Sequence, residues 1–296
     1  MRVLGLGDNV VDKYKHLHIM YPGGNALNIA ALARLSGIEA GYLGVFGDDE
    51  AGRHVYETAV ALGIDVSRCR HYQGENGYAE VELVSGDRVF IGSNQGGVSK
   101  EHPICLSKED LDYIAGYDVC HTSVFSYAED ALPQIREASP LVSMDFSNRY
   151  EEAYLRRCCP YLDMAEISCS EVSWEETLRR MQELMDFGVK EMVLATRGSE
   201  GAIVLRGTRV YRQSPCLVEA TDTMAAGDSF ITSFLIHYVE GAKNAVDFPE
   251  NSGKYGVVSR EEYLQELMKV SLYQAAIFAA GNCQRDGSFG FGKHYD

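Results

Sequence analysis

Apolar residues in this chain follow two spacings in turn, with short β-rich runs separated by longer stretches of helical periodicity. From residue 107 onward the alternation is regular. The expected helices are 107–115, 128–138, 150–158 and 173–187, and the expected strands that follow them are 117–122, 141–146, 163–168 and 189–195. Strands separated by helices are typical of right-handed β-α-β units. The pattern predicts an α/β fold with a doubly wound, mostly parallel sheet and helices on both of its faces.

The N-terminal residues fit the same fold. Residues 3–7 and 42–46 are expected to be strands. Between them, Tyr21-Pro22-Gly23-Gly24 is expected to be a turn, and Asn25 is expected to cap the helix that follows it.

A small β excursion is expected outside the main sheet. Residues 78–84 and 88–93 flank Ser85-Gly86-Asp87, which is a hairpin signal, and their mixed polarity suits a sheet with one exposed face. An extended run at 14–20 has the same mixed character, and it would place His16 and His18 on one face of a strand. We therefore expect residues 13–21 and 78–93 to form a second, smaller sheet.

The C-terminal part is expected to hold an edge hairpin and two helices. Residues 202–206 and 209–213 predict an antiparallel hairpin, and helical periodicity appears at 228–240 and 261–280. The polar residues 242–260 between the helices are expected to be a long surface loop or insertion.

The stretch from Thr221 to Phe230 holds the clearest candidate chemistry. The small residues Ala225-Ala226-Gly227 lead into Asp228, which lies in the first turn of a helix. Backbone N–H groups at a helix N-terminus bind anions, because they have no acceptor within the helix and lie at the positive end of its dipole. A carboxylate at this place either caps the helix electrostatically or takes a proton from a hydroxyl that attacks the bound anion.

Composition narrows the range of partners. The chain has 296 residues and a net charge of −16, from 27 basic and 43 acidic residues, without a basic run. Nucleic acid and anionic membranes are therefore not expected as partners. No apolar run approaches the roughly 18 residues of a membrane span, and no signal peptide is expected. Eight scattered cysteines without C-x-x-C spacing are expected to be free thiols in a cytoplasmic protein.

Further polar residues follow the predicted strands, where ligands bind in a doubly wound sheet. These residues are Asp8, Asn9, Asp12, the Gly-rich turn Gly23-Gly24-Asn25-Ala26-Leu27-Asn28, Asp145 to Arg149, Glu171 and Thr196-Arg197-Gly198. Any one of them alone would be a weak signal, but their joint placement is specific.

Together these residues resemble the PfkB, or ribokinase-like, family of carbohydrate kinases. Residues 23–30 (GGNALNIA) are similar to the N-terminal family signature, and residues 222–228 (DTMAAGD) to the C-terminal signature Asp-Thr-x-Gly-Ala-Gly-Asp. Residues 47–52 (GDDEAG) match a further family motif. Within the family, the segments most similar to fructoselysine 6-kinases are 7–12, 87–90 and 128–133. The resemblance implies one ribokinase-like domain over 1–296, in which the β excursion is a lid over the sugar, a dimer surface or both.

The resemblance implies a role for each matching residue. Asp228 would be the general base, and the backbone of Ala225, Ala226 and Gly227, with the N–H of Asp228, would form an anion hole for the transferring phosphoryl group. The substrate-binding residues would be Asp8, Asp12, Gly23, Gly24, Asn25, Asn28, Arg88 and Arg149. Thr196, Gly198, Gly201 and Asn282 would bind ATP, and Glu171 would help to place Mg²⁺ through waters. A requirement for a monovalent cation stays open.

Three residues depart from the family pattern. Ala225 replaces a glycine, which would strain the backbone if the position needs a positive φ and would matter little otherwise. Ser147 and Ser168 each replace an asparagine, and a hydroxyl is shorter and less versatile than an amide. The base, Gly227, Arg149 and Glu171 are all retained, so we expect an active enzyme.

The leading hypothesis is an ATP-dependent kinase that phosphorylates a primary hydroxyl, the 6-hydroxyl of fructoselysine or a related fructosamine. Asp8 near Asp12 would favour the ammonium group of such a substrate. The alternatives are another PfkB kinase that acts on a hexose or nucleoside, and a catalytically silent protein of the same fold that binds a sugar or nucleotide. A homodimer through the β excursion is compatible with each of them.

Overall fold

The computed structural model describes residues 1–84, 87–245 and 259–296, and the side chains of these residues except 83, 84, 87 and 88. Its main sheet has nine strands in the order β13-β12-β11-β10-β9-β8-β1-β4-β5. These strands are β1 (Arg2–Gly7), β4 (Glu39–Gly47), β5 (Arg70–Tyr72), β8 (Val119–Ser123), β9 (Val142–Asp145), β10 (Met164–Ser168), β11 (Met192–Thr196), β12 (Ala202–Arg206) and β13 (Arg209–Gln213). All pairs from β5 to β11 are parallel, whereas β12 and β13 are added antiparallel. The mostly parallel sheet and its edge hairpin are therefore confirmed.

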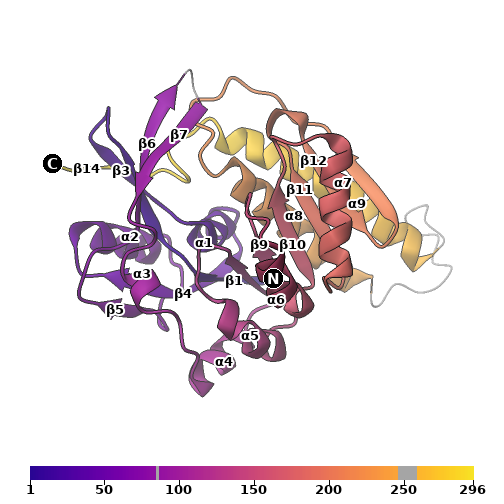
Figure 1. Ribbon diagram of the computed structural model, residues 1–296, viewed down its shortest axis with the longest axis horizontal. Helices are drawn as coiled ribbons and strands as arrows, with labels where there is room; N and C mark the ends of the chain where they lie inside the picture. Colours follow the sequence, from indigo (N-terminus) through magenta and orange to yellow (C-terminus); the bar gives the residue numbers. More distant parts are fainter. Residues whose placement is uncertain (85–86, 246–258) are drawn as a thin grey trace.

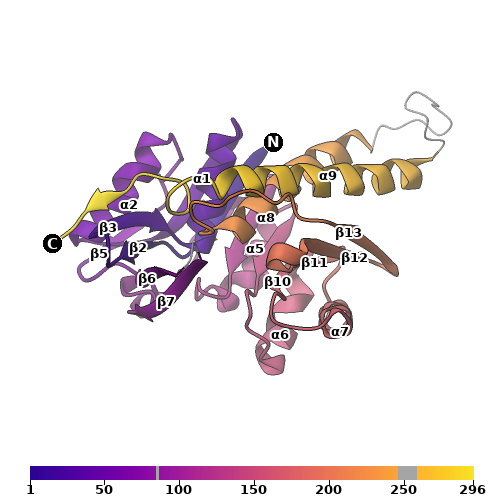
Figure 2. The same cartoon turned by 90° about the horizontal axis from the view of Figure 1, so that it is seen from above.

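Helices cover both faces of this sheet. They are α1 (Asn25–Leu35), α2 (Glu50–Ala61), α3 (Val98–Glu101), α4 (Lys108–Ile114), α5 (Leu132–Ala138), α6 (Glu152–Cys158), α7 (Trp174–Asp186), α8 (Ala226–Asn244) and α9 (Arg260–Asn282). A hydrophobic core lies on each face of the sheet, and consecutive residues of β10 belong to different cores. Met164 packs in the cluster that holds Phe234 of α8, and Ala165 packs in the cluster that holds Met181 of α7. Figure 2 shows α8 and α9 on one side and α6 and α7 on the other.

A second sheet lies at one end of the molecule, with the order β14-β3-β2-β6-β7 (Figure 1). Its strands are β2 (Val10–Tyr14), β3 (Ile19–Gly23), β6 (Tyr78–Val84), β7 (Asp87–Ser93) and β14 (Lys293–His294). The antiparallel pairing expected of residues 78–84 with 88–93 is confirmed. The single extended run expected at 14–20 is wrong, because residues 15–18 form a turn between β2 and β3, so His16 and His18 do not share a strand face.

Two further expectations need correction. Tyr21-Pro22-Gly23 is not a turn but the end of β3, where it pairs with β2 in antiparallel register. The expected insertion at 242–260 is helical at both ends, because residues 242–244 continue α8 and Arg260 begins α9, and its residues 246–258 lie outside the described residues. None of the helices in the described part of the chain has the length and apolar character to cross a bilayer.

The start of α1 lies directly against β1. A Cβ atom at Gly5 would come within 2.1 Å of the carbonyl oxygen of Ala26, so this packing requires glycine. The N-cap is Gly24, with a φ of 107° and no side-chain cap, whereas Asn25 is the first helical residue. The expected cap by Asn25 is therefore wrong, and its amide is directed to other partners.

Candidate functional site

A cleft of about 1450 Å³ crosses the carboxyl ends of the parallel strands, and residues of both sheets line it. We call it the main cleft. Most of the predicted site residues line it: Asp8, Asp12, Gly24, Asn25, Asn28, Arg149, Thr196, Gly198, Gly201, Ala225, Ala226, Gly227 and Asp228. The fold thus brings together residues from nearly the whole length of the chain.

Asp8 anchors the start of α1. Its Oδ2 accepts from the backbone N–H of Asn25 at 2.6 Å, and its Oδ1 from that of Ala26 at 3.2 Å. The hydroxyls of Ser123 and Ser126 donate to the same Oδ1 at 2.7 and 2.8 Å. A carboxylate here satisfies N–H groups that have no acceptor within the helix and interacts favourably with its dipole. The sequence did not predict this role, because the two serines come from a distant strand end.

Gly23 makes room for Asp12. A Cβ atom at position 23 would lie only 2.5 Å from Oδ2 of Asp12, and the Asp12 side chain is buried.

Arg149 and Phe125 line another part of the main cleft. The exposed guanidinium of Arg149 lies 5.8 Å from the centroid of the Phe125 ring.

Helix α8 begins at a residue in the left-handed conformation. Ala225 has φ 53° and ψ 23°, so the position that carries glycine in the family signature does need a positive φ. For alanine this conformation costs roughly 1–2 kcal/mol. The N–H of Ala226 donates to the carbonyl of Thr223 at 3.2 Å, so this amide already has an acceptor. A Cβ atom at Gly227 would meet nothing within 4 Å, which leaves the backbone there open to close approach.

Asp222 holds the loop before α8 in place. Its buried carboxylate accepts from the hydroxyl of Tyr14 at 2.6 Å and from the backbone N–H groups of Gly287 at 2.8 Å and Met224 at 2.9 Å. Tyr14 belongs to β2 and Gly287 to the C-terminal segment. One carboxylate therefore ties the second sheet, the C-terminal segment and the start of α8 together.

Two amides of α1 hold the carboxylate of Asp228. Nδ2 of Asn25 donates to its Oδ1 at 2.9 Å, and Nδ2 of Asn28 donates to its Oδ2 at 2.6 Å. The two asparagines are three residues apart and therefore share a helix face. Asn25 also donates to Asp145 Oδ2 at 2.7 Å, and its Oδ1 lies 3.0 Å from Nε2 of His121. Since a carboxylate oxygen can accept two hydrogen bonds, Asp228 can still accept from a hydroxyl.

Three buried ionisable side chains adjoin this arrangement. Burial lowers the pKa of His121 to about 3, so its ring is neutral at physiological pH. Burial raises the pKa of Asp145 to about 6, although the N–H of Ser147 opposes the shift. Burial, with the negative charge of Asp145, also raises the pKa of Glu166 well above its ordinary value. Glu166 is the register partner of Asp145, and neither of its carboxyl oxygens has a hydrogen-bond partner among the described residues.

Three predicted residues, Gly23, Glu171 and Asn282, do not line the main cleft. Glu171 is exposed and is not among the residues that line it. Asn282 is buried, and its Nδ2 donates to the carbonyl of Ser288 at 2.8 Å, so it holds the C-terminal segment. The side chain of Arg88 lies outside the described residues. Among the residues that the structure describes, no three His, Cys, Asp or Glu side chains form a metal-binding cluster.

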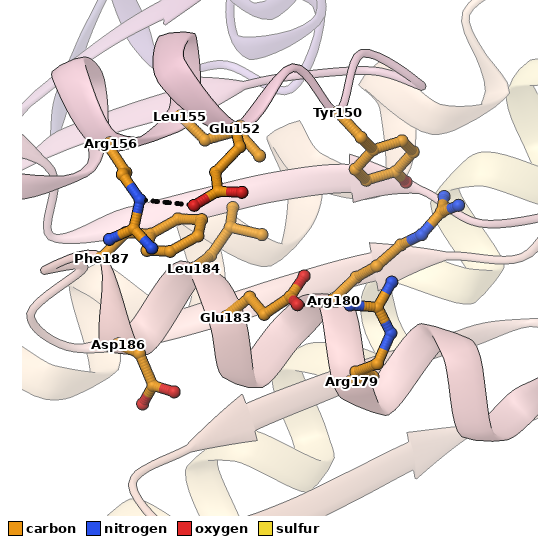
Figure 3. Close-up of a pocket in the computed structure, with 10 residues that line it drawn as sticks. All are labelled: Tyr150, Glu152, Leu155, Arg156, Arg179, Arg180, Glu183, Leu184, Asp186 and Phe187. Carbon is orange, nitrogen blue, oxygen red and sulfur yellow. Dashed lines mark hydrogen bonds and ion pairs between the residues drawn. The ribbon is translucent and has the colours of Figure 1, made fainter.

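A smaller cavity of about 540 Å³ lies between α6 and α7 (Figure 3). It contains three arginines, but each of them is paired with a glutamate. Arg156 pairs with Glu152, and Arg179 and Arg180 pair with Glu176, all at 2.7 Å. The cavity therefore lacks the uncompensated positive charge of an anion site, and the main cleft is the stronger candidate.

The main cleft combines a carboxylate in the first turn of a helix with Gly-rich backbone and polar side chains at the strand ends. The family model described as pfkB family carbohydrate kinase matches residues 7–255. The chain belongs to this family.

Individual relatives agree with this membership. The chain is 38% identical over 296 residues to the fructosamine kinase FrlD of Bacillus subtilis, covering 100% of this chain and 95% of that protein. It is 36% identical over 237 residues to the fructoselysine 6-kinase of Escherichia coli, covering 80% and 88%. Among solved structures, ribokinase from Giardia lamblia superposes with a TM-score of 0.75 at 15% identity, covering 98% and 95%. Fructokinase with bound ATP from Xylella fastidiosa gives 0.72 at 18% identity, covering 97% and 94%. The fold is therefore the ribokinase-like one.

Replacing Ala225 by glycine should stabilise this PfkB protein. Because glycine adopts a positive φ without steric cost, we expect Ala225→Gly to raise the free energy of unfolding by up to about 1 kcal/mol. Urea denaturation of both proteins measures the difference. The matched control is Ala226→Gly, where the backbone is helical and glycine should not stabilise. A lower stability of Ala225→Gly than of the wild type would show that the left-handed alanine carries no strain.

Replacing Glu166 by glutamine should change the pH dependence of stability. In the wild type the pKa of this carboxyl is higher in the folded than in the unfolded state. Its stabilising contribution is therefore complete below its unfolded pKa of about 4.3, and stability falls by up to about 1.4 kcal/mol per pH unit above it, until the folded pKa is reached.

In Glu166→Gln this loss disappears, so the variant should gain on the wild type as the pH rises from 5 to 7. Urea denaturation at several pH values tests this, with Glu57→Gln on an exposed position of α2 as the control for the substitution. A constant difference between Glu166→Gln and the wild type over this range would contradict the neutral state of Glu166.

Proposed function

We propose that this chain is an ATP-dependent kinase that phosphorylates the 6-hydroxyl of fructoselysine or a related fructosamine. The observation that carries the proposal is the carboxylate of Asp228, which Asn25 and Asn28 hold in the first turn of α8 beside Gly227. Phosphoryl transfer to a hydroxyl needs a base and an anion-binding group at one place. The start of α8 offers both.

In this mechanism Asp228 takes the proton of the acceptor hydroxyl. The hydroxyl oxygen of the sugar forms the new bond to the γ-phosphorus while the bond from this phosphorus to the ADP oxygen breaks. The backbone at Gly227, which is open to close approach, stabilises the charge on the transferring phosphoryl oxygens together with the positive end of the α8 dipole, whereas the N–H of Ala226 already donates to Thr223. We assign the sugar hydroxyls to Asp12, Asn25 and Asn28 and to the backbone at Gly23 and Gly24.

A fructosamine suits both the relatives and the charge of the site. The two relatives described above are named a fructosamine kinase and a fructoselysine 6-kinase. The negative charges of Asp8 and Asp12 favour the ammonium group of such a substrate, and Asp8 acts at a distance because its oxygens already hold α1. The volume of the cleft, about 1450 Å³, leaves room for a nucleotide together with a sugar that carries an amino-acid arm.

We assign ATP to the part of the cleft near Thr196, Gly198 and Gly201. Apolar side chains line the cleft at Leu217, Val218, Ala276, Ala279 and Ala280, which suits an adenine ring. Asn282 supports this region by holding the C-terminal segment. Since the described residues hold no cluster of three ligands, Mg²⁺ would bind mainly through nucleotide phosphates and waters, with Glu171 as an outer carboxylate and Arg149 on the phosphates. A monovalent-cation requirement is part of the same proposal.

The second sheet is proposed as a lid within a single domain of residues 1–296. Tyr78 and Phe90 line the cleft from β6 and β7, and closure would exclude water from the reaction. Arg88 is assigned to the substrate in the closed lid.

Val89, Phe90 and Ile91 are all exposed on the edge strand β7, and such an apolar run also suits a homodimer contact. The free cysteines and the use of ATP fit a cytoplasmic enzyme.

Asp228→Asn tests the base. Loss of a general base should reduce kcat by about 10²- to 10⁴-fold, and sugar affinity should change little because the amide keeps the size of the side chain. Steady-state kinetics and calorimetric titration with fructoselysine measure the two effects. Asp112→Asn, on an exposed position of α4, is the control and should match the wild type. A kcat for Asp228→Asn close to that of the wild type would exclude Asp228 as the base.

A substrate panel tests the specificity. With ATP and Mg²⁺, kcat/KM for fructoselysine should exceed that for fructose, ribose and a nucleoside by more than about tenfold, which corresponds to about 1.4 kcal/mol of transition-state binding. A coupled assay for ADP gives the values. Equal or higher efficiency with fructose or a nucleoside would assign the chain to another PfkB activity. No turnover with any sugar would favour a silent binding protein.

A further inference from the structure

His121 lies at the centre of a buried hydrogen-bond chain that ends at Asp228. His121 of β8 and Ser143 of β9 are register partners in the main sheet, and both are fully buried. Oγ of Ser143 lies 2.7 Å from Nδ1 of His121, and Nε2 of His121 lies 3.0 Å from Oδ1 of Asn25. Asn25 then donates through Nδ2 to Asp228 and to Asp145. The chain connects the interior of the sheet to the carboxylate at the start of α8.

The chemistry of each group fixes the direction of these bonds. Ionised carboxylates only accept, so the NH₂ group of Asn25 faces them and its oxygen faces His121. An amide oxygen also only accepts, so Nε2 of His121 must carry a proton. The ring is neutral and therefore has a single N–H, because burial lowers its pKa to about 3. Nδ1 is then the acceptor of the Ser143 hydroxyl, and one tautomer satisfies every partner.

We propose that His121 is a positioning residue for phosphoryl transfer: its Nε2–H holds the Asn25 amide, and through it the Asp228 carboxylate, in the orientation that receives the hydroxyl proton. This inference rests on the proposed role of Asp228 as the base. His121 is not among the residues that line the main cleft, so its effect on the reaction passes through Asn25.

The carboxylate needs more than one fixed contact. Asn28 orients one oxygen of Asp228, but the torsion of a terminal carboxylate is soft, and the second oxygen depends on Asn25. The Asn25 amide is shared between Asp228 and Asp145, and its own terminal torsion is equally soft. The bond from His121 to the amide oxygen fixes this torsion. Without that bond the amide can turn toward Asp145 and release Asp228.

If His121 served only to fill the core, its volume would matter and its hydrogen bonds would not. A buried apolar side chain of similar volume would fill the same space between β8 and α1. It would leave the oxygen of Asn25 without its donor and the hydroxyl of Ser143 without its acceptor, although the core would stay filled. The effect of such a replacement on kcat therefore separates positioning from packing.

The tautomer can be observed directly in the intact protein. Long-range ¹H–¹⁵N correlation spectra of protein with ¹⁵N-labelled histidine distinguish the two tautomers and the imidazolium, and His121→Gln assigns the signal among the eight histidines. We expect a neutral ring with the proton on Nε2 throughout the range from pH 6 to 8. A proton on Nδ1, or an imidazolium at pH 7, would overturn the proposal.

Two substitutions then test the effect on the reaction with fructoselysine and ATP. His121→Leu keeps the volume but removes the donor, and we expect kcat to fall by about tenfold or more while the sugar Kd changes by less than about threefold. In His121→Gln the side-chain NH₂ can replace Nε2–H, so kcat should recover to within about threefold of the wild type.

The proposal fails if His121→Leu keeps the wild-type kcat, or if His121→Gln has wild-type thermal stability but turns over as slowly as His121→Leu. If His121→Leu does not fold, Ser143→Ala takes its place. It frees Nδ1 and should lower kcat without changing the sugar Kd, and an unchanged kcat would count against positioning. The kinase proposal is tested separately, because it fails if the wild type turns over no sugar, whereas the positioning proposal fails with an active wild type.

Discussion

The hydrogen bonds from Asn25 and Asn28 to Asp228 set the geometry on which the rest of the site depends. They require α1 and α8 to begin at fixed points relative to each other. Asp8 meets this requirement on one side by anchoring α1, and Gly5 lets α1 lie directly on β1. The carboxylate is therefore oriented before any ligand arrives. Preorganisation of this kind avoids a cost of rearrangement during the reaction.

Asp222 supplies the matching constraint for α8. Because Tyr14 donates to it from β2, the second sheet is tied to the same loop whose backbone we assign to the phosphoryl group. Any displacement of β2 against the main sheet must therefore act on the start of α8.

Glu166 and Asp145 lie on neighbouring strands of the main sheet, and burial disfavours negative charge on both. A neutral Glu166 leaves this pair with one negative charge instead of two, which would ease the approach of the anionic phosphoryl group in the proposed reaction.

The sequence predicted the layers of the fold because apolar periodicity reports local structure, and it predicted the main cleft because strand ends and helix starts carry recognisable motifs. It failed where a contact between distant segments decides the outcome. Asp8, and not Asn25, satisfies the start of α1, and no local pattern reveals this. His121 reads as an ordinary strand residue until the register places it beside Ser143. An alanine gives no local sign of a positive φ, so the backbone conformation of Ala225 was suggested only by the glycine that the family signature has at this position.

In the proposed reaction this site transfers a phosphoryl group to a primary hydroxyl of a fructosamine. In such a substrate C1 carries the amine, so C6 holds the remaining primary hydroxyl of the sugar. Proton-coupled ³¹P NMR of the product formed from fructoselysine and ATP identifies the acceptor directly. We predict a phosphate monoester signal split by two methylene protons, in an amount equal to the ADP formed. A signal split by one proton, or inorganic phosphate without an ester, would contradict the claim.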